Sequence, residues 1–212
     1  MPGTSISHPL FARLFALFAP AAERFCGAAH RDELLDGLEG KVIEIGAGRG
    51  LNFAHYPSSV TEVVAIEPEP YLRARATEAA QQAPVPVSVV GGTAETPAVE
   101  DGTFGAAVFS LVLCPVPDQA VALAACSRVL RPGGEPRFYE HVLAEEPGLA
   151  RLQRRVDLVW PHLGAGCHAS RDTPRAIEQA GFSVTSSRRF AFRPCVLFAP
   201  VFPHVIGRAV RP

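Results

Sequence analysis

A short apolar run that leads directly into three alternating glycines constrains the fold of this chain most. The segment reads VIEIGAGRG over residues 42–50, and its glycines are Gly46, Gly48 and Gly50. A β-branched run of this length is typical of a buried strand, and glycine permits a tight turn where the strand ends. Backbone without Cβ atoms also lets a ligand come close. The sequence therefore predicts a ligand-binding turn between a strand and a helix.

The rest of the chain alternates between strand and helix patterns. Apolar runs predict strands at residues 41–46, 61–67, 85–91, 103–113 and 136–142. Helical spacing and capping residues predict helices at residues 51–56, 68–82, 117–134 and 171–182. Two last extended runs, at 182–193 and 204–210, are too close for a crossover helix and should pair antiparallel. The pattern predicts an α/β fold: a doubly wound, mostly parallel seven-stranded sheet with an antiparallel last strand and helices on both faces.

Individual residues predict where some of these elements begin and end. Asp118 is the expected N-cap of one helix, and the Pro-Gly-Gly run at 132–134 is the expected end of the same helix. Thr173 is the expected N-cap of the last helix. Pro136 lacks a backbone N–H, so it predicts a bend at the start of the fifth strand.

The length predicts a single domain, residues 1–212, that is large enough to bury a core. Residues 1–36 are expected to form an N-terminal helical cap, because the apolar stretch at 9–20 has helical spacing and would bury its face over the ligand cleft. That stretch is shorter than the ~20 residues that span a bilayer, so no integral membrane segment is expected, although weak peripheral contact stays open. Residues 143–171 interrupt the alternation and predict an insertion that covers the site, with a helix near 147–159.

Composition narrows the function classes. The net charge is -1, which argues against nucleic acid as the main partner because phosphate binding needs an excess of Lys and Arg. The five cysteines include no CxxC pair, so reduced thiols and a cytoplasmic location are expected. Cys167 and His168 are neighbours, but the sequence offers no further ligands beside them, so no metal site is predicted. A small-molecule substrate is expected, and the sequence leaves the oligomeric state open.

Polar residues near the ends of three predicted strands indicate which ligand the glycines bind. The G-x-G-x-G spacing differs from the dinucleotide pattern, and the G-K-[ST] of a phosphate-binding loop is absent. Glu67 ends the second strand, where a carboxylate can accept both hydroxyls of a ribose. The segment GGTAE at 91–95 follows the third strand, where a polar loop can reach a nucleobase edge. Together with Glu44, these residues predict one site, with a glycine turn that only packs as the alternative.

Five segments, in order, resemble the successive motifs of the class I S-adenosylmethionine (SAM) methyltransferases. They are VIEIGAGRG, AIEP, GTAE, FGAAVFSLVLCPVPD and CSRVLRPGGEPRFYEHV, and they span about residues 40 to 142. The SRVLRPGG segment is similar to the small-molecule (type 11) branch. The segments LVLCPV, YEHV, VWPHLGAGCHASRDT and AGF more closely resemble the methyltransferase-like thiol S-methyltransferases and extend the match to about residue 182. Eukaryotic members of that family carry a long membrane anchor, where this chain has only the short stretch at 9–20.

The resemblance implies SAM as the cofactor and S-adenosylhomocysteine as the product. Backbone N–H groups of the glycine turn would bind the carboxylate of SAM. The residues that the resemblance and the strand ends assign to the cofactor are Glu44, Gly46, Ala47, Gly48, Gly50, Asn52, Glu67, Pro68, Thr93, Ala94, Glu95 and Leu111.

Methyl transfer from a sulfonium is an in-line displacement, so alignment supplies most of the catalysis. His141, at the end of the fifth strand, is the expected base if the acceptor must lose a proton, and Glu140 should point to the opposite face. Cys114 is expected to form pocket wall and not to act as a nucleophile, because no basic residue adjoins it in sequence. The residues expected to contact substrate are Cys114, Tyr139, Trp160, His162, His168 and Arg171.

Several functions fit these features. The favoured one is methylation of a small thiol, such as a reduced dithiol natural product of the dithiolopyrrolone type, in secondary metabolism or detoxification. Thiols have a pKa near ~8.5 and need a weak base or none. The alternative is O- or C-methylation of a quinone-like or polyketide-like molecule, which needs a stronger base. A SAM-binding or membrane-peripheral module without turnover also stays open, and the glycine spacing disfavours nicotinamide-dependent reduction.

Overall fold

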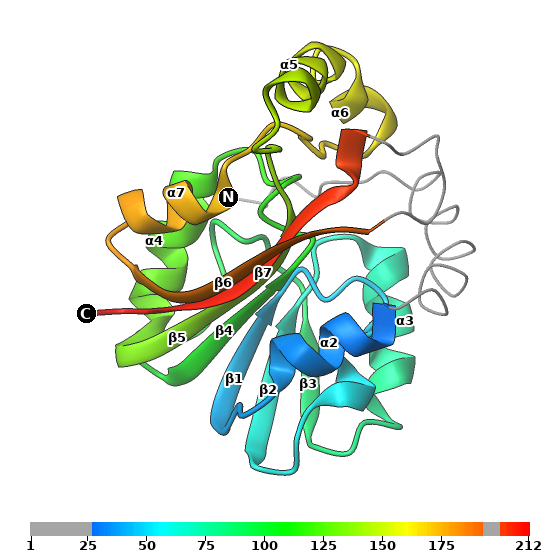
Figure 1. The fold of residues 1–212 in the computed structure, drawn as a ribbon. Helices are drawn as coiled ribbons and strands as arrows, with labels where there is room; N and C mark the ends of the chain where they lie inside the picture. Colours follow the sequence, from blue (N-terminus) through cyan, green and yellow to red (C-terminus); the bar gives the residue numbers. More distant parts are fainter. Residues whose placement is uncertain (1–26, 193–199) are drawn as a thin grey trace.

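The computed structural model describes residues 27–192 and 200–212 (Figure 1). The helix expected at 9–20 and most of the cap expected at 1–36 therefore lie outside the described residues. In the part of the chain that is described, no helix is both long enough and apolar enough to cross a membrane.

The predicted sheet is confirmed. Its seven strands follow the order β3-β2-β1-β4-β5-β7-β6. They are β1 (Gly40–Ile45), β2 (Val60–Ile66), β3 (Val87–Val90), β4 (Phe104–Ser110), β5 (Leu130–His141), β6 (Ser183–Ala191) and β7 (Pro203–Val210). Strands β1 to β5 pair in parallel, and β7 pairs antiparallel with both β5 and β6. The chain order reverses between β1 and β4, which is the switch point where doubly wound sheets bind ligands.

Helices cover both faces of the sheet (Figure 1). They are α2 (Ala28–Leu35), the 3-10 turn η2 (Phe53–His55), α3 (Pro70–Ala80), α4 (Gln119–Val129), α5 (Pro147–Val156), α6 (Trp160–Leu163) and α7 (Thr173–Gln179). Side chains alternate along β1, so Ile43 packs in one core with α4 and α7, and Val42 packs in the other with α2 and α3. The two faces thus form two separate apolar cores.

Several predicted boundaries were wrong, among them the start of β5, which begins at Leu130 and not at 136. Helix α4 begins after its predicted N-cap Asp118 but ends at Val129, because the chain turns extended there and enters β5. The Pro-Gly-Gly run at 132–134 therefore lies inside β5, where the pairing with β4 shifts register between Leu130 and Glu135. This irregularity comes just before Pro136, where the bend was expected.

The N-cap of the last helix lies one residue before the predicted N-cap, Thr173. The observed N-cap is Asp172, and Thr173 is the first helical residue. The Thr173 side chain is fully buried and its hydroxyl accepts a hydrogen bond from Gln119 of α4, so it is not available to cap α7. The fourth strand is also shorter than expected, ending at Ser110, because Leu111 adopts a φ of 60°.

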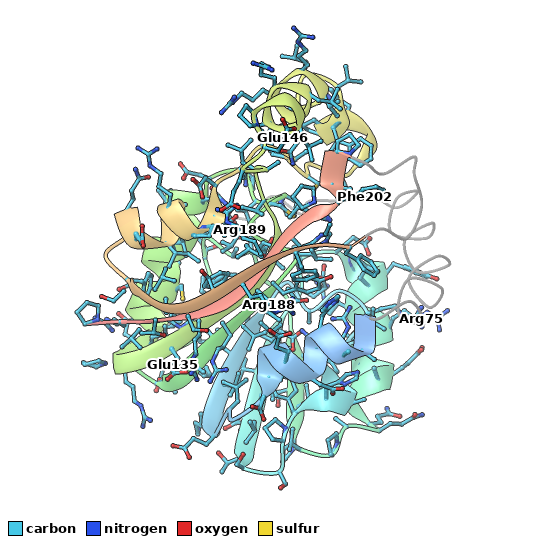
Figure 2. The ribbon with its side chains drawn as sticks, viewed as in Figure 1. Arg75, Glu135, Glu146, Arg188, Arg189 and Phe202 are labelled. Carbon is cyan, nitrogen blue, oxygen red and sulfur yellow. The ribbon has the colours of Figure 1, made fainter. Side chains whose placement is uncertain are left out.

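The expected insertion contains α5 and α6, which lie above the carboxyl end of β5 in Figure 1. Glu146 caps α5 at the top of the molecule by accepting hydrogen bonds from Gly148 and Leu149 (Figure 2). Gln153 on the same helix is completely buried. Its amide group donates to the carbonyls of Val142, Ala169 and Pro200 and accepts from the Ala144 N–H. One side chain therefore attaches α5 to three other segments.

Replacing Gln153 with leucine is expected to lower the free energy of unfolding by about 2–4 kcal/mol, because buried backbone groups lose their hydrogen-bond partners. Urea unfolding measures the change. The neighbouring Leu152 is 46% exposed, and its replacement with glutamine serves as the control, expected to change stability by less than about 0.5 kcal/mol. Equal effects of the two substitutions would show that Gln153 does not hold the insertion.

Candidate active site

The glycine turn after β1 combines tight packing with one open position. Gly46, Gly48 and Gly50 have φ values of 69°, 58° and 81°, in the region that favours glycine. A Cβ at Gly46 would meet Val112 at 2.5 Å, and one at Gly50 would meet Phe53 at 2.7 Å. A Cβ at Gly48 would meet no atom of the described residues within 4 Å. Gly46 and Gly50 are thus required by packing, whereas Gly48 leaves space beside the backbone. Ala47 is buried within the turn, and its N–H donates to the Ile66 carbonyl.

Glu44 fixes the segment that follows the turn. Its carboxylate is 2% exposed and accepts hydrogen bonds from the Asn52 amide at 2.9 Å and the Tyr56 hydroxyl at 2.7 Å. Arg31 of α2 in turn donates to the Asn52 side chain. Burial raises the pKa of Glu44 to about 7, although its two hydrogen bonds oppose that shift. Glu44 and Asn52 therefore tie the residues after the glycine turn to the end of β1.

Glu67 links the second strand end to the glycine turn. One carboxylate oxygen accepts from the Gly48 N–H at 2.7 Å, and the other accepts from the Glu69 N–H at 2.9 Å. Burial raises the pKa of Glu67 to about 7, against the effect of these two bonds. Each oxygen keeps a lone pair for a further donor, as two ribose hydroxyls would supply. Pro68, the next residue, was also predicted to contact the cofactor. Its carbonyl accepts a hydrogen bond from the Arg73 guanidinium.

The loop after β3 presents an unsatisfied acceptor. Glu95 Oε1 is buried and has no hydrogen-bond partner among the described residues. Ala94 beside it packs in the apolar core, and Thr93 shares a hydrogen bond with Thr96. Buried polar atoms are nearly always paired, so this oxygen is suited to a donor from a ligand.

Leu111, directly after β4, is a non-glycine residue in the left-handed region, and its N–H donates to the Tyr139 carbonyl at 2.7 Å. Strained backbone of this kind clusters at functional sites. The open Gly48, Glu67 and the orphaned Glu95 oxygen follow the neighbouring strands β1, β2 and β3, and Glu44 lies near the end of β1 beside them. Together they offer an open backbone position and unused carboxylate acceptors to a ligand at this edge of the sheet.

Three side chains that are far apart in the sequence, two cysteines and a histidine, meet near the ends of β4 and β5. His141 Nδ1 lies 3.5 Å from the sulfur of Cys114 and 3.2 Å from the sulfur of Cys167. Both cysteines are buried, at 1% and 8% exposure. Burial raises the pKa of the Cys114 thiol, whereas hydrogen bonds from Cys114, His141 and Trp160 lower that of Cys167 to about 5. We refer to Cys114, His141 and Cys167 as the Cys-His-Cys cluster.

This cluster changes the interpretation of two predicted residues. Cys114 has a basic neighbour in space, although it has none in sequence. His168 is not part of the cluster, because its ring points to Asp157, with Nδ1 3.8 Å from Oδ2.

Glu140 is fully buried and acts on the loop after β4. One oxygen accepts the N–H groups of Val112 and Leu113, at 2.8 and 2.9 Å, and the other accepts that of Cys114 at 3.1 Å. Burial raises its pKa, and the three backbone donors oppose the rise. Sequence reasoning ranked Glu140 low because it alternates with His141. An acid in an otherwise apolar strand was the available signal for a structural role.

The predicted substrate residues separate into two groups. Tyr139 is buried, with its ring 5.4 Å from that of His204, and Trp160 contributes to the surroundings of Cys167. Arg171 is half-buried and donates to the Leu113 carbonyl at 2.6 Å, so it too lies beside the cluster. His162 and His168 are not brought into it: His162 is exposed on α6.

Sequence reasoning missed an aromatic wall next to the cluster. The ring of His204 lies 4.6 Å from that of His141, and His30 lies 4.4 Å from Phe190. Burial lowers the pKa of His204 to about 3, so this histidine is neutral. These residues come from α2, β6 and β7, and no local pattern marks them.

The buried acids predict a distinctive pH dependence. Glu44 has a folded-state pKa of about 7, above its unfolded value, so the folded chain binds more protons between those two pKa values. The contribution of Glu44 to stability is present at low pH and is lost as pH rises to about 7. Between about pH 5 and pH 8, wild type should lose about 2–3 kcal/mol relative to Glu44→Gln. Urea unfolding at several pH values measures this difference, and a difference that does not vary with pH would contradict the prediction.

Comparisons with known proteins identify the class. A family model described as a methyltransferase domain matches residues 43–137. Human thiol S-methyltransferase TMT1B is 32% identical over 212 residues, covering 95% of this chain and 86% of that protein. The ubiquinone/menaquinone biosynthesis C-methyltransferase UbiE of Methylobacterium nodulans is 34% identical over 105 residues, 49% of this chain and 39% of its own. The solved structure of an S-adenosylmethionine-dependent methyltransferase from Mesorhizobium loti matches with a TM-score of 0.65 and 19% identity, over 92% of this chain and 100% of that one.

The reversed β7 strand and the polar strand ends around an open glycine define a class I SAM-dependent methyltransferase, and SAM is its cofactor. Since the match to human TMT1B extends over nearly all of both chains, the chain belongs to the family of SAM-dependent methyltransferases that includes this thiol S-methyltransferase. The family resemblance expected from the sequence is confirmed. Nicotinamide-dependent reduction and a module without turnover are not supported.

Proposed function

We propose that this enzyme transfers the methyl group of SAM to the sulfur of a small-molecule thiol. The observation that best supports this proposal is the environment of His141. Within the described part of the chain, its ring contacts two thiols and the ring of His204, and it hydrogen-bonds no carboxylate. A histidine that serves as a strong general base is usually oriented by a carboxylate. The site is therefore suited to an acceptor that loses its proton readily, and a thiol does so near neutral pH.

The proposed roles follow from position. Bound SAM supplies an electrophilic methyl group. Glu67, Glu95 and the glycine turn hold the cofactor, and Glu44 with Asn52 holds the turn. His141 accepts the acceptor proton where one must be removed. The aromatic wall of Tyr139 and its neighbours favours an apolar acceptor.

Three expectations from the sequence extend this proposal: which segments cover the active site, where in the cell the enzyme acts, and which thiol it methylates. We propose that residues 1–36 form a helical cap over the active site and that residues 143–171 cover it as well, so that together they exclude water. A reduced dithiol such as a dithiolopyrrolone, a role in secondary metabolism and a cytoplasmic location with weak peripheral membrane contact also stay predictions. Cell fractionation tests the location. The name of the human relative supports sulfur as the acceptor atom but no particular thiol.

A second candidate is C- or O-methylation of a quinone-like or polyketide-like molecule. The partial match to UbiE, a C-methyltransferase by name, favours it. Methylation of carbon or oxygen requires His141 to act as a strong base, although its ring contacts two thiols and no carboxylate among the described residues.

A SAM-turnover assay separates the two candidates. The acceptor panel contains small thiols and dithiols beside matched phenols and quinols, and mass spectrometry identifies the products. We expect methylated products from the sulfur acceptors, with turnover that falls less than about 10-fold in His141→Ala. The exposed His162→Ala is the control and should match wild type. Products from oxygen or carbon acceptors alone, with a loss of about 100-fold or more in His141→Ala, would replace the proposal with the second candidate.

A further inference from the structure

The Cys-His-Cys cluster has the composition of a metal site as well as that of a pocket wall. One ligand atom from each of Cys114, His141 and Cys167 lies within 4.8 Å of the other two. Among the described residues, this is the group of three or more potential ligands that the fold brings together. Thiolate and imidazole are the ligands of structural and catalytic zinc sites.

The separations suit a tetrahedral ion. Zn–S bonds of about 2.3 Å and Zn–N bonds of about 2.0–2.1 Å place two neighbouring ligand atoms of a tetrahedron about 3.5–3.8 Å apart. His141 Nδ1 lies 3.5 Å from one sulfur and 3.2 Å from the other. The same ring nitrogen faces both sulfurs, so the donors converge on one point.

The surrounding backbone holds both cysteines in this arrangement. The N–H of Cys114 is bound by the buried Glu140 carboxylate at 3.1 Å. The N–H of His168 donates to the Cys114 carbonyl at 3.0 Å, which joins the two cysteine-bearing segments directly. Cys167 follows Ala165 and Gly166, whose φ values of 49° and 86° turn the chain back toward the sheet. A non-glycine residue in this region is strained, and such strain persists where the surroundings demand it.

Charge also favours an ion here. Two thiolates and a neutral imidazole carry a charge of about -2, which a divalent cation neutralises in a buried site. Arg171 is the basic residue that the fold places beside the cluster, and it is half-buried with its guanidinium bound to the Leu113 carbonyl. Glu140, on the other side, adds a further acid next to Cys114. Cys114 and Cys167 therefore have an acid and only one guanidinium near them when no ion is bound.

We propose that Cys114, His141 and Cys167 form a binding site for a thiophilic divalent cation of the Zn²⁺ class. The site uses three protein ligands, so it leaves a fourth position, as in zinc sites that bind water or substrate. It would connect the insertion, through Cys167, to the ends of β4 and β5. This inference does not depend on the acceptor of the methyl group, because metal binding is measured without SAM or turnover. With an ion bound, His141 is a ligand and does not accept a proton, so the base role proposed above belongs to the metal-free protein.

The test measures zinc on the full chain. Cys26 and Cys195 are replaced with serine, so that only the three described cysteines remain. The protein is kept reduced with a phosphine, loaded with Zn²⁺, dialysed against a weak chelator and analysed by mass spectrometry of the metal. We expect retention of about one zinc ion per chain. Cd²⁺ replacement should add the ultraviolet absorption of metal-bound thiolate.

Matched variants assign the ligands. Cys114→Ala and Cys167→Ala should each lose the zinc and the cadmium absorption. Cys126→Ala is the control, since Cys126 is equally buried but lies on α4 and has no histidine partner in the described part of the chain. It should retain both the zinc and the cadmium absorption. Thermal unfolding without metal checks that each variant folds, and zinc should raise the Tm of the parent but not of Cys167→Ala. A folded parent that retains no zinc, or zinc retained by both Cys114→Ala and Cys167→Ala, would overturn the proposal.

Discussion

Replacing Glu67 with alanine is expected to weaken SAM binding by about 100-fold or more. A carboxylate that accepts both ribose hydroxyls forms two charge-assisted hydrogen bonds, each worth about 1.5–3 kcal/mol. Every ~1.4 kcal/mol lost corresponds to a tenfold weaker affinity. The change also removes the acceptor for the Gly48 N–H, bound at 2.7 Å, and so loosens the open position of the glycine turn. Isothermal titration with SAM measures the effect.

The matched control is Glu62→Ala on the same strand. Glu62 is at the opposite end of β2 from the site and forms a surface ion pair with Lys41. Such pairs contribute about 0–1 kcal/mol to stability, so SAM affinity should not change. Glu67→Gln keeps one acceptor and should fall between wild type and Glu67→Ala. If Glu67→Ala folds and binds SAM as tightly as Glu62→Ala, the ribose assignment is wrong.

Replacing Glu140 with alanine is expected to lower the free energy of unfolding by about 3–5 kcal/mol, the largest stability change that we predict. Three backbone N–H groups, those of Val112, Leu113 and Cys114, lose their acceptor in a fully buried place. Released from Glu140, the loop would also let Cys114 move away from His141. Urea unfolding measures the stability change, and reaction of Cys114 with a thiol reagent reports the exposure of the loop.

The control for this change is Glu135→Ala on the same strand, labelled in Figure 2. Glu135 is partly exposed and pairs with Arg137 at 2.9 Å. Its loss should cost no more than about 1 kcal/mol. Glu140→Gln retains a carbonyl acceptor, so it should restore part of the stability that Glu140→Ala loses. Equal stabilities of the Glu140 and Glu135 alanine variants would show that the three hydrogen bonds do not hold the loop.

Most of the fold could be predicted from local sequence patterns. Strand β1 and its glycines were predictable because an apolar run and residues with positive φ are properties of neighbouring positions. The predicted helix boundaries were wrong where contacts with residues distant in the sequence determine the conformation. Thr173 has the side chain of an N-cap, but its hydroxyl accepts from Gln119 of another helix. The Pro-Gly-Gly run at 132–134 has the composition of a helix end, but the pairing of β5 with β4 absorbs it as a register shift.

The candidate site divides in the same way. The positions of Glu67 and Glu95 could be located because each follows a strand, and parallel strands of one sheet end at the same edge. Glu44 lies near the carboxyl end of β1, at that edge. Their order along the chain therefore sets their order in space. Their role in binding the cofactor stays a prediction.

The Cys-His-Cys cluster could not be read from the sequence. Its members are separated by 27 and 26 residues, and the insertion that carries Cys167 has no periodic pattern that fixes where it returns to the sheet. Cys167 and His168 are adjacent in sequence, yet only the cysteine reaches His141 while the histidine turns to Asp157. The sequence by itself determined the sheet and the edge at which the glycine turn and the acids gather, because these follow from local periodicity and strand direction. The tertiary structure alone decided which side chains meet at the ends of β4 and β5, because those contacts depend on the path of an irregular segment.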